Sequence, residues 1–300
     1  MSTGQSGGRS VSVVIPIGRA DEDLTLQLDA LAGQSYPDPW ELVLSLNAPG
    51  DDARAALDAA VTNHLQRDED SAITVTVVDS SSVRSASHAR NVGAEAASGE
   101  LLLFCDGDDI ADEDWMAELV VALDRSEAVG GHLEEELLAV PGQEDWRPLA
   151  TPGALPTFLG FPYLVSANMG VVRAVFQAIG GFDTTLIRGE DIALSWDLIE
   201  KGVELDYAPA AVMHYRHRRG LWPMMHQHYL YGRGMSEIMA RRGRPGDRGG
   251  GGLRALKPNA QPVARKNAIY FVRRGSIAAG RLVGLGAERL RQQRSVERVS

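Results

Sequence analysis

The first third of the chain alternates short runs of β-branched and apolar residues with segments in which leucines and alanines recur at helical spacing. The first run, Val11 to Pro16, ends at a proline, and the segment Asp21 to Ala32 after it has leucines three and four residues apart. Strands that alternate with helices favour a parallel sheet with right-handed connections, so the pattern predicts an α/β fold. It also predicts strands at 40–46, 73–78 and 101–104 and helices at 51–65 and 88–97.

Three polar segments follow predicted strands, at 17–21, 47–52 and 106–109. Ligands of parallel α/β sheets bind at the carboxyl ends of the strands, so we expect these segments to contribute to one shared site. The pattern of the second half is less regular. It predicts helices at 115–123 and 192–200, a proline-rich loop at 146–163, and strands at 165–172, 203–207 and 211–215.

An acidic cluster, Asp106-Gly107-Asp108-Asp109, comes directly after a predicted buried strand. Asp106 and Asp108 are two residues apart and can present their carboxylates on the same side of an extended backbone. Mg²⁺ and Mn²⁺ prefer such oxygen ligands together with substrate phosphates. An isolated Asp-x-Asp is also typical of a solvated turn in which Asp109 or Asp112 caps the next helix. The cluster alone therefore leaves both interpretations open.

The formal net charge of −10 conceals an uneven distribution of charge. The segment from His214 to the end holds nineteen Lys and Arg residues and four Asp and Glu residues, whereas the rest of the chain is strongly acidic. A basic tail favours an anionic partner, either membrane phospholipid or a phosphate-bearing substrate. Its arginines match no nucleic-acid recognition module, so no nucleic-acid partner is expected.

Composition along the chain predicts the domain organisation and the cellular location of the protein. We expect a flexible N-terminus at 1–10, an α/β domain at 11–220 and a basic helical extension at 221–300, with a flexible Gly- and Arg-rich break near 241–262. Cys105 is the only cysteine, which fits a reducing compartment, and no signal peptide or membrane-spanning run is visible. The expectation is a cytoplasmic protein with peripheral contact at the inner face of the membrane.

Several segments, in a fixed order, resemble family 2 inverting glycosyltransferases, which share the GT-A fold. The resemblance runs from Val11 to about His217 and implies a Rossmann-like, mostly parallel central sheet flanked by helices. The segments that carry it are Val-Ser-Val-Val-Ile-Pro at 11–16, Ser-His-Ala-Arg-Asn-Val-Gly at 87–93, Gly-Glu-Leu-Leu-Leu-Phe-Cys-Asp-Gly-Asp-Asp at 99–109, Ser-Ala-Asn-Met-Gly-Val-Val-Arg at 166–173, Gly-Gly-Phe-Asp at 180–183, Arg-Gly-Glu-Asp-Ile-Ala-Leu-Ser-Trp-Asp-Leu at 188–198 and Val-Met-His-Tyr at 212–215.

This resemblance implies transfer of a sugar from a nucleotide-diphosphate donor, a UDP-sugar by default, to an acceptor hydroxyl with inversion. The acceptor class stays open among glycans, lipid-linked molecules and small molecules. Asp106 and Asp108 match the family's motif for Mn²⁺ or Mg²⁺ and diphosphate, and Asp191 matches the general base. His214 matches a further metal ligand of some relatives, with a buried, hydrogen-bonded histidine as the alternative.

The other residues that we expect at the nucleotide-sugar site are Pro16, Asn47, Arg84, Arg90 and Glu190. For the two arginines, the alternative to contacting diphosphate or ribose is ion pairing with the acidic body. Asn47 stands where many relatives have an acidic residue, and its amide offers a donor and an acceptor to a base edge. Glu190 and Asp191 also suit a helix N-terminus.

Two other classes of protein compete with this interpretation. A nucleotidyltransferase or sugar-nucleotide pyrophosphorylase uses a similar α/β half, but commonly carries a glycine-rich basic loop after the first strand. Gly18-Arg19 is too short to resemble that loop. A non-catalytic nucleotide-sugar-binding protein of the same fold is the second alternative, and the intact Asp106, Asp108 and Asp191 argue against it.

Overall fold

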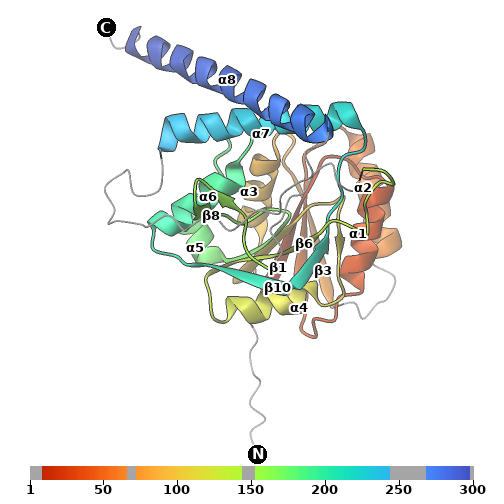
Figure 1. Cartoon of the computed structure of the whole chain (residues 1–300). Coiled ribbons are helices and arrows are strands. Elements are labelled where there is room, and N and C mark those ends of the chain that lie inside the picture. Colours follow the sequence, from red (N-terminus) through yellow and green to blue (C-terminus); the bar gives the residue numbers. More distant parts are fainter. Residues whose placement is uncertain (1–8, 66–71, 144–152, 244–267, 298–300) are drawn as a thin grey trace, which may run out of the picture.

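Eight of the described strands form a central sheet in the order β3-β2-β1-β4-β9-β6-β10-β5. Figure 1 shows this sheet in the middle of the molecule. The computed structural model describes residues 9–65, 72–143, 153–243 and 268–297. β9 runs antiparallel to β4 and β6, and β5 runs antiparallel to β10, whereas the other neighbours are parallel. The predicted mostly parallel α/β sheet is therefore confirmed. The strands are β1 (Val11–Ile17), β2 (Trp40–Leu46), β3 (Ile73–Asp79), β4 (Leu101–Cys105), β5 (Ile110–Ala111), β6 (Ala128–Glu134), β9 (Asn168–Val172) and β10 (Leu205–His214).

Helices cover both faces of this sheet. Side chains of β1 alternate between the two faces: Val13 and Ile15 belong to one buried cluster and Val14 to another. Strands buried on both faces are typical of parallel sheets. The first cluster contains side chains of α1 (Glu22–Ala32), α2 (Asp51–His64) and α4 (Trp115–Leu123), and the second contains side chains of α3 (Ala86–Ala96), α5 (Arg173–Ala178) and α6 (Glu190–Glu200).

Some predicted elements differ from the structure. The expected strands at 203–207 and 211–215 are one strand, β10, interrupted by a bulge between Ala208 and Val212. Pro209 lies in the bulge, where a residue without an N–H group is tolerated. Neither predicted helix cap is correct, because α4 follows Asp114, and Asp109 instead accepts a hydrogen bond from the backbone of Arg216. β5, β6 and α5 were not predicted.

The predicted loop at 146–163 also contains structure. Its described part holds a short hairpin of β7 (Thr157–Phe158) and β8 (Phe161–Pro162), and residues 146–152 lie outside the described residues. Phe158 stacks on Trp196 of α6, with 5.6 Å between the ring centroids. The hairpin therefore packs against α6.

The C-terminal extension forms two long helices, α7 (Leu221–Arg242) and α8 (Ala268–Glu297), which lie across one end of the molecule (Figure 1). Ile238 of α7 belongs to a buried cluster with Phe158 and Trp196, so α7 is packed onto the α/β domain. The predicted break begins inside α7, and its remainder at 244–262 lies outside the described residues, as do residues 1–8. No helix among the described residues combines the length and apolar character needed to cross a membrane.

Small residues let α7 and α8 approach until their backbones touch. A Cβ atom added at Gly280 of α8 would overlap the carbonyl oxygen of Tyr229, and one at Gly232 of α7 would overlap that of Ile277. The hydroxyl of Ser236 donates to the backbone oxygen of Arg281 at 3.1 Å. The position of α8 is thus set by backbone contacts.

Gly280→Ala is expected to lower the free energy of unfolding by about 2 kcal/mol, because the added methyl group overpacks a crossing of two backbones. Thermal unfolding and hydrogen exchange in α8 measure the effect. Gly286 lies on the same helix with open space around it. Gly286→Ala is therefore the matched control and should raise stability by up to about 1 kcal/mol through helix propensity. Equal stability of the two variants would contradict the tight crossing.

Candidate active site

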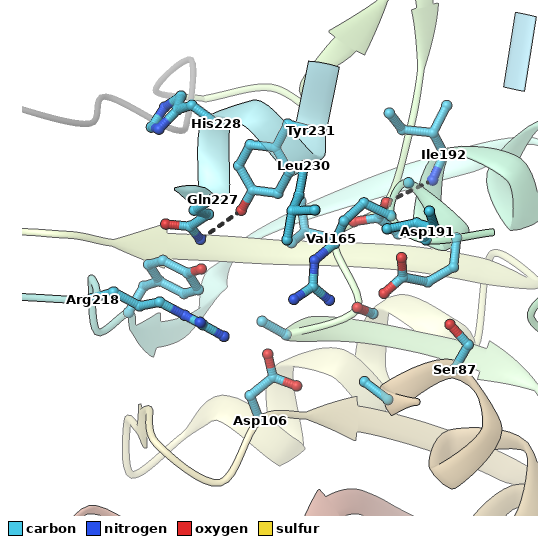
Figure 2. A pocket seen from close by; sticks show the side chains of 18 of the residues that line it. Ser87, Asp106, Val165, Asp191, Ile192, Arg218, Gln227, His228, Leu230 and Tyr231 are labelled. Carbon is cyan, nitrogen blue, oxygen red and sulfur yellow. Dashed lines mark hydrogen bonds between the residues drawn. The ribbon is translucent and has the colours of Figure 1, made fainter. Parts of the chain in front are cut away.

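Eight of the nine predicted site residues line one cavity of about 2590 Å³ at the carboxyl ends of the strands. α7 and α8 form its far wall. In Figure 2, Asp106 and Asp191 lie on different sides of the open space, and Tyr231 of α7 lies above Asp106. The eight residues are Pro16, Asn47, Arg84, Arg90, Asp106, Asp108, Glu190 and Asp191. The expectation that the strand ends share one site agrees with this geometry.

The acidic cluster forms a turn between β4 and β5. Carboxylate oxygens of Asp106, Asp108 and Asp109 all lie within 4.8 Å of one another. Gln27, a buried residue of α1, holds the turn: its side-chain oxygen accepts from the N–H of Ala111 at 2.9 Å and its amide donates to the backbone oxygen of Asp106 at 3.3 Å. Sequence reasoning missed Gln27, because nothing in a helix pattern distinguishes this inward-facing glutamine.

The turn concentrates more negative charge than its surroundings neutralise. Desolvation within the cavity and the charge of Asp106 raise the pKa of Asp108 to about 6, although the residue is exposed at the surface of the turn. Burial and both neighbouring carboxylates raise the pKa of Asp109 well above its usual value. Asp109 accepts from the backbone N–H of Arg216 at 2.7 Å, but its second carboxylate oxygen has no hydrogen-bond partner among the described residues. These oxygens fit a divalent cation, which takes several carboxylate ligands.

Arg90 of α3 is buried between the turn and α6. One guanidinium nitrogen lies 2.5 Å from Asp106 Oδ1 and another lies 3.4 Å from Glu190 Oε1. Burial lowers the pKa of Arg90, but the charges of Asp106 and Glu190 outweigh it and leave the pKa above its usual value. Arg90 is thus an ion-paired residue of the acidic body, the alternative that the sequence left open. It joins the end of β4 to the start of α6.

Asp191 lies in the first turn of α6, after Gly189, whose φ of 84° favours glycine. Burial and the adjacent charge of Glu190 raise the pKa of Asp191 to about 7. Its Oδ1 accepts from the backbone N–H of Ile192 at 2.8 Å, as drawn in Figure 2. A Cβ atom at Gly234 of α7 would overlap the backbone oxygen of Arg188, so α7 packs directly on the segment that carries Asp191.

The structure gives Asn47 a different task from the one expected. Its amide nitrogen donates to the backbone oxygens of Ser80 at 2.5 Å and Val83 at 2.8 Å, and its oxygen accepts from the N–H of Ser85 at 3.0 Å. Both N–H groups of the amide therefore shape the loop between β3 and α3, and this geometry does not support contact with a base edge. Arg84 is exposed on that loop and lines the cavity.

His214 is not brought to the acidic turn. Its Nδ1 lies 2.8 Å from Glu134 Oε2 and its Nε2 lies 3.8 Å from Asp112 Oδ2, and the residue does not line the cavity. The geometry therefore matches the hydrogen-bonded alternative, and the expectation of a metal ligand is not supported. Arg216, which sequence reasoning missed, does reach the turn: its Nε donates to the backbone oxygen of Asp108 at 2.7 Å.

The position of Arg216 follows from pairing that the local sequence does not reveal. His214 at the end of β10 pairs with Ile110 of β5, directly after the acidic cluster. The residues that follow β10 therefore reach the cluster, and Arg216, His217 and Arg218 line the cavity. The last motif of the resemblance ends at Tyr215, one residue before Arg216.

The fold is that of the GT-A glycosyltransferases. The structure resembles a mannosyltransferase, PcManGT from Pyrobaculum calidifontis, solved in complex with GDP-Man and Mn²⁺, with a TM-score of 0.60 and 18% sequence identity over 93% of this chain and 73% of that chain. It also resembles residues 1–349 of S. aureus TarS in complex with UDP-GlcNAc, with a TM-score of 0.53 and 16% identity over 77% of this chain and 67% of that chain.

The sequence model of glycosyl transferase family 2 matches residues 12–178. The chain therefore belongs to glycosyl transferase family 2, which confirms the predicted resemblance. The matched region includes the acidic turn and ends before Asp191.

Two curated relatives also match the sequence of this chain. The pre-mycofactocin glycosyltransferase of Mycobacterium tuberculosis is 27% identical over 172 residues, which are 51% of this chain and 34% of the relative. The O-antigen biosynthesis protein RfbC of Myxococcus xanthus is 28% identical over 222 residues, which are 66% of this chain and 16% of the relative. The chain thus spans only a minor part of the length of these relatives.

Arg90→Met is expected to lower the free energy of unfolding by about 3 kcal/mol, because it leaves two carboxylates without their buried partner. Thermal or urea unfolding measures the change. Arg125→Met is the matched control, since Arg125 is exposed and pairs with Asp206 at 3.1 Å. Exposed pairs contribute at most about 1 kcal/mol. An Arg90→Met protein as stable as the control would show that the pair does not hold β4 to α6.

Proposed function

We propose that the protein is a metal-dependent inverting glycosyltransferase that moves a sugar from a nucleoside-diphosphate donor to an acceptor hydroxyl. The observation that carries the proposal is the acidic turn and Asp191 facing one cavity, with Arg90 pairing to both elements. Family membership supports it, as do fold relatives solved with GDP-Man and UDP-GlcNAc. A UDP-sugar is the default donor, and the class of sugar stays open.

Asp106 and Asp108 would hold Mn²⁺ or Mg²⁺, and Asp109 adds a buried carboxylate behind them. When bound, the metal supplies positive charge against the leaving diphosphate. Arg90 neutralises part of the charge of Asp106 and fixes the direction of its carboxylate. On the donor side, Pro16 and Arg84 line the cavity near the ends of β1 and β3, and Asn47 holds the loop that carries Arg84.

Asp191 would act as the general base. The acceptor oxygen forms a bond to the anomeric carbon while its proton passes to the Asp191 carboxylate. On the opposite side, the bond between that carbon and the diphosphate oxygen breaks, and the nucleoside diphosphate leaves with the electron pair. One displacement inverts the anomeric centre. A base whose pKa is about 7 is suited to accept this proton near neutral pH.

The alternatives have less support. Four residues separate β1 from α1, so the described structure offers no long glycine-rich loop there for a nucleotidyltransferase. In a nucleotidyltransferase, Asp191 would also have no catalytic role. A non-catalytic protein of the same fold would need neither the raised pKa of Asp191 nor its position at the cavity, and the transfer assay below distinguishes it.

Asp191→Asn is expected to bind the donor with unchanged affinity but to lose transfer by at least about a hundredfold, since general-base catalysis contributes about 10²–10⁴. In the unchanged protein, Asp191 must be deprotonated to act. Its kcat/KM should therefore fall as pH decreases below about 7 and level off above it. Steady-state transfer kinetics and calorimetric donor binding measure both effects.

The control for this experiment is Asp58→Asn, which removes an exposed carboxylate of α2. It should leave the rate and the pH profile unchanged. Turnover of Asp191→Asn at the rate of the control would reject Asp191 as the base. A flat pH profile between pH 6 and 8 would contradict the assignment as well.

Asp108→Ala is expected to abolish the part of nucleotide-sugar affinity that depends on Mn²⁺ and to leave metal-free affinity in place. Calorimetry with Mn²⁺ and with a chelator separates the two. Asp112→Ala is the matched control, because Asp112 is close in sequence but does not line the cavity. Equal metal dependence in both variants would exclude Asp108 as a ligand.

A further inference from the structure

α8 exposes a row of large apolar side chains. Leu282 is 73% exposed, Phe271 is 62% exposed and Leu290 is 58% exposed, and Val283 and Leu285 are also exposed. Phe271 and Leu282 are three helical turns apart and therefore lie on the same face. That face is turned away from α7, because Gly280 and Gly284 on the other side contact α7. We call the face formed by these five apolar residues the α8 apolar face.

The charges beside this face have one sign. Arg274, Arg281 and Arg289 are exposed on α8. From Ala268 to Val296 the sequence holds a single acidic residue, Glu288. Glu288 is buried and pairs with Arg241 of α7 at 3.0 Å and with Arg291 at 2.7 Å. Cations thus lie beside the apolar face and, at Arg289, within it, whereas the rest of the protein is acidic.

We propose that α8 lies in the headgroup region of an anionic phospholipid bilayer, with its apolar face turned into the lipid. A helix with exposed apolar residues between arginines is the pattern that binds lipid in the plane of the interface. The arginines complement anionic headgroups, and the leucines enter the acyl boundary. A nucleic acid would pair with the arginines but leave the leucines in water. A second copy would bring a face of the same positive charge.

The placement of α8 suits this orientation. It is the outermost element at its end of the molecule, and α4 lies at the opposite end (Figure 1). The glycine contacts fix α8 against α7, so the whole domain takes its orientation from this helix. Phe271, Arg274 and Leu282 also line the cavity that contains Asp106 and Asp191. Docking therefore puts the part of that cavity lined by these residues next to the lipid surface.

A cavity next to the lipid surface limits the class of acceptor that can reach it. This conclusion rests on the proposed function. A hydroxyl carried by an amphiphile anchored in the bilayer can enter the cavity beside Phe271 and Leu282 and reach toward Asp191. The nucleotide-sugar donor enters from water at the strand ends. The acceptor that fits is therefore a lipid-linked one.

The protein should sediment with vesicles made of equal parts of phosphatidylcholine and phosphatidylglycerol, but not with phosphatidylcholine vesicles. Added salt should reduce the binding. Leu290→Glu should lower the coefficient for partitioning onto the vesicles at least about tenfold. It removes an apolar group that the lipid would bury and adds a negative charge that the anionic headgroups repel. Arg289→Gln should lower it about fivefold.

Val121→Glu and Arg54→Gln are the matched controls. Val121 is 55% exposed on α4, and Arg54 is exposed on α2. Both should bind vesicles as the unchanged protein does. Equal binding to both kinds of vesicle, or unchanged binding of Leu290→Glu, would overturn the proposal. A dimer that Leu290→Glu dissociates, in a protein that binds no vesicles, would show that a second copy covers this face.

The test separates this inference from the proposed function. Asp191→Asn should still bind vesicles, and Leu290→Glu should keep nucleotide-sugar binding while losing transfer to an acceptor embedded in vesicles. If the unchanged protein binds no vesicles but still transfers the sugar, the docking alone is rejected. Vesicle binding without any transfer would reject the proposed function alone.

Discussion

The buried guanidinium of Arg90 sets the geometry on which the candidate site depends. A buried cation must be paired, and here its partners belong to two elements far apart in the chain: Asp106 at the end of β4 and Glu190 at the start of α6. Each partner lies beside a residue with a proposed chemical task, Asp108 in one case and Asp191 in the other. Because one rigid group contacts both, the acidic turn and the proposed base keep a fixed separation.

The acidic turn is a second electrostatic constraint, which Arg90 balances only in part. Arg90 is paired to Asp106, whereas burial and mutual repulsion raise the pKa values of Asp108 and Asp109. The unsatisfied oxygen of Asp109 adds to that imbalance. A turn with this excess of buried negative charge is destabilising unless a cation balances the charge.

The first four strands and their helices could be predicted because their signals are local: the apolar runs of β1 and β4 are continuous in the sequence. β6 was missed because Gly130 and Gly131 interrupt its pattern. Gly131 has no room for a side chain, since Asn168 and the backbone oxygen of Ala211 occupy that space. The hydrogen-bond partners of Asn47 and His214 could not be predicted for a related reason. Their partners, the 80–85 loop and Glu134, come from elements that the local sequence does not place.

α7 connects the chemistry to the outer surface through backbone contacts on both of its sides. On the inner side, Gly234 lets the helix touch the backbone of Arg188, three residues before Asp191. On the outer side, Gly232 lets it touch the backbone of α8. Contacts between backbones cannot be relieved by a change of rotamer, so the wall of the cavity beside Asp191 moves only if both helices move. Each glycine in a helix interior makes the helix less stable than alanine would, by about 1 kcal/mol. The glycines allow the two close contacts, and through them α7 fixes the position of the proposed base relative to α8.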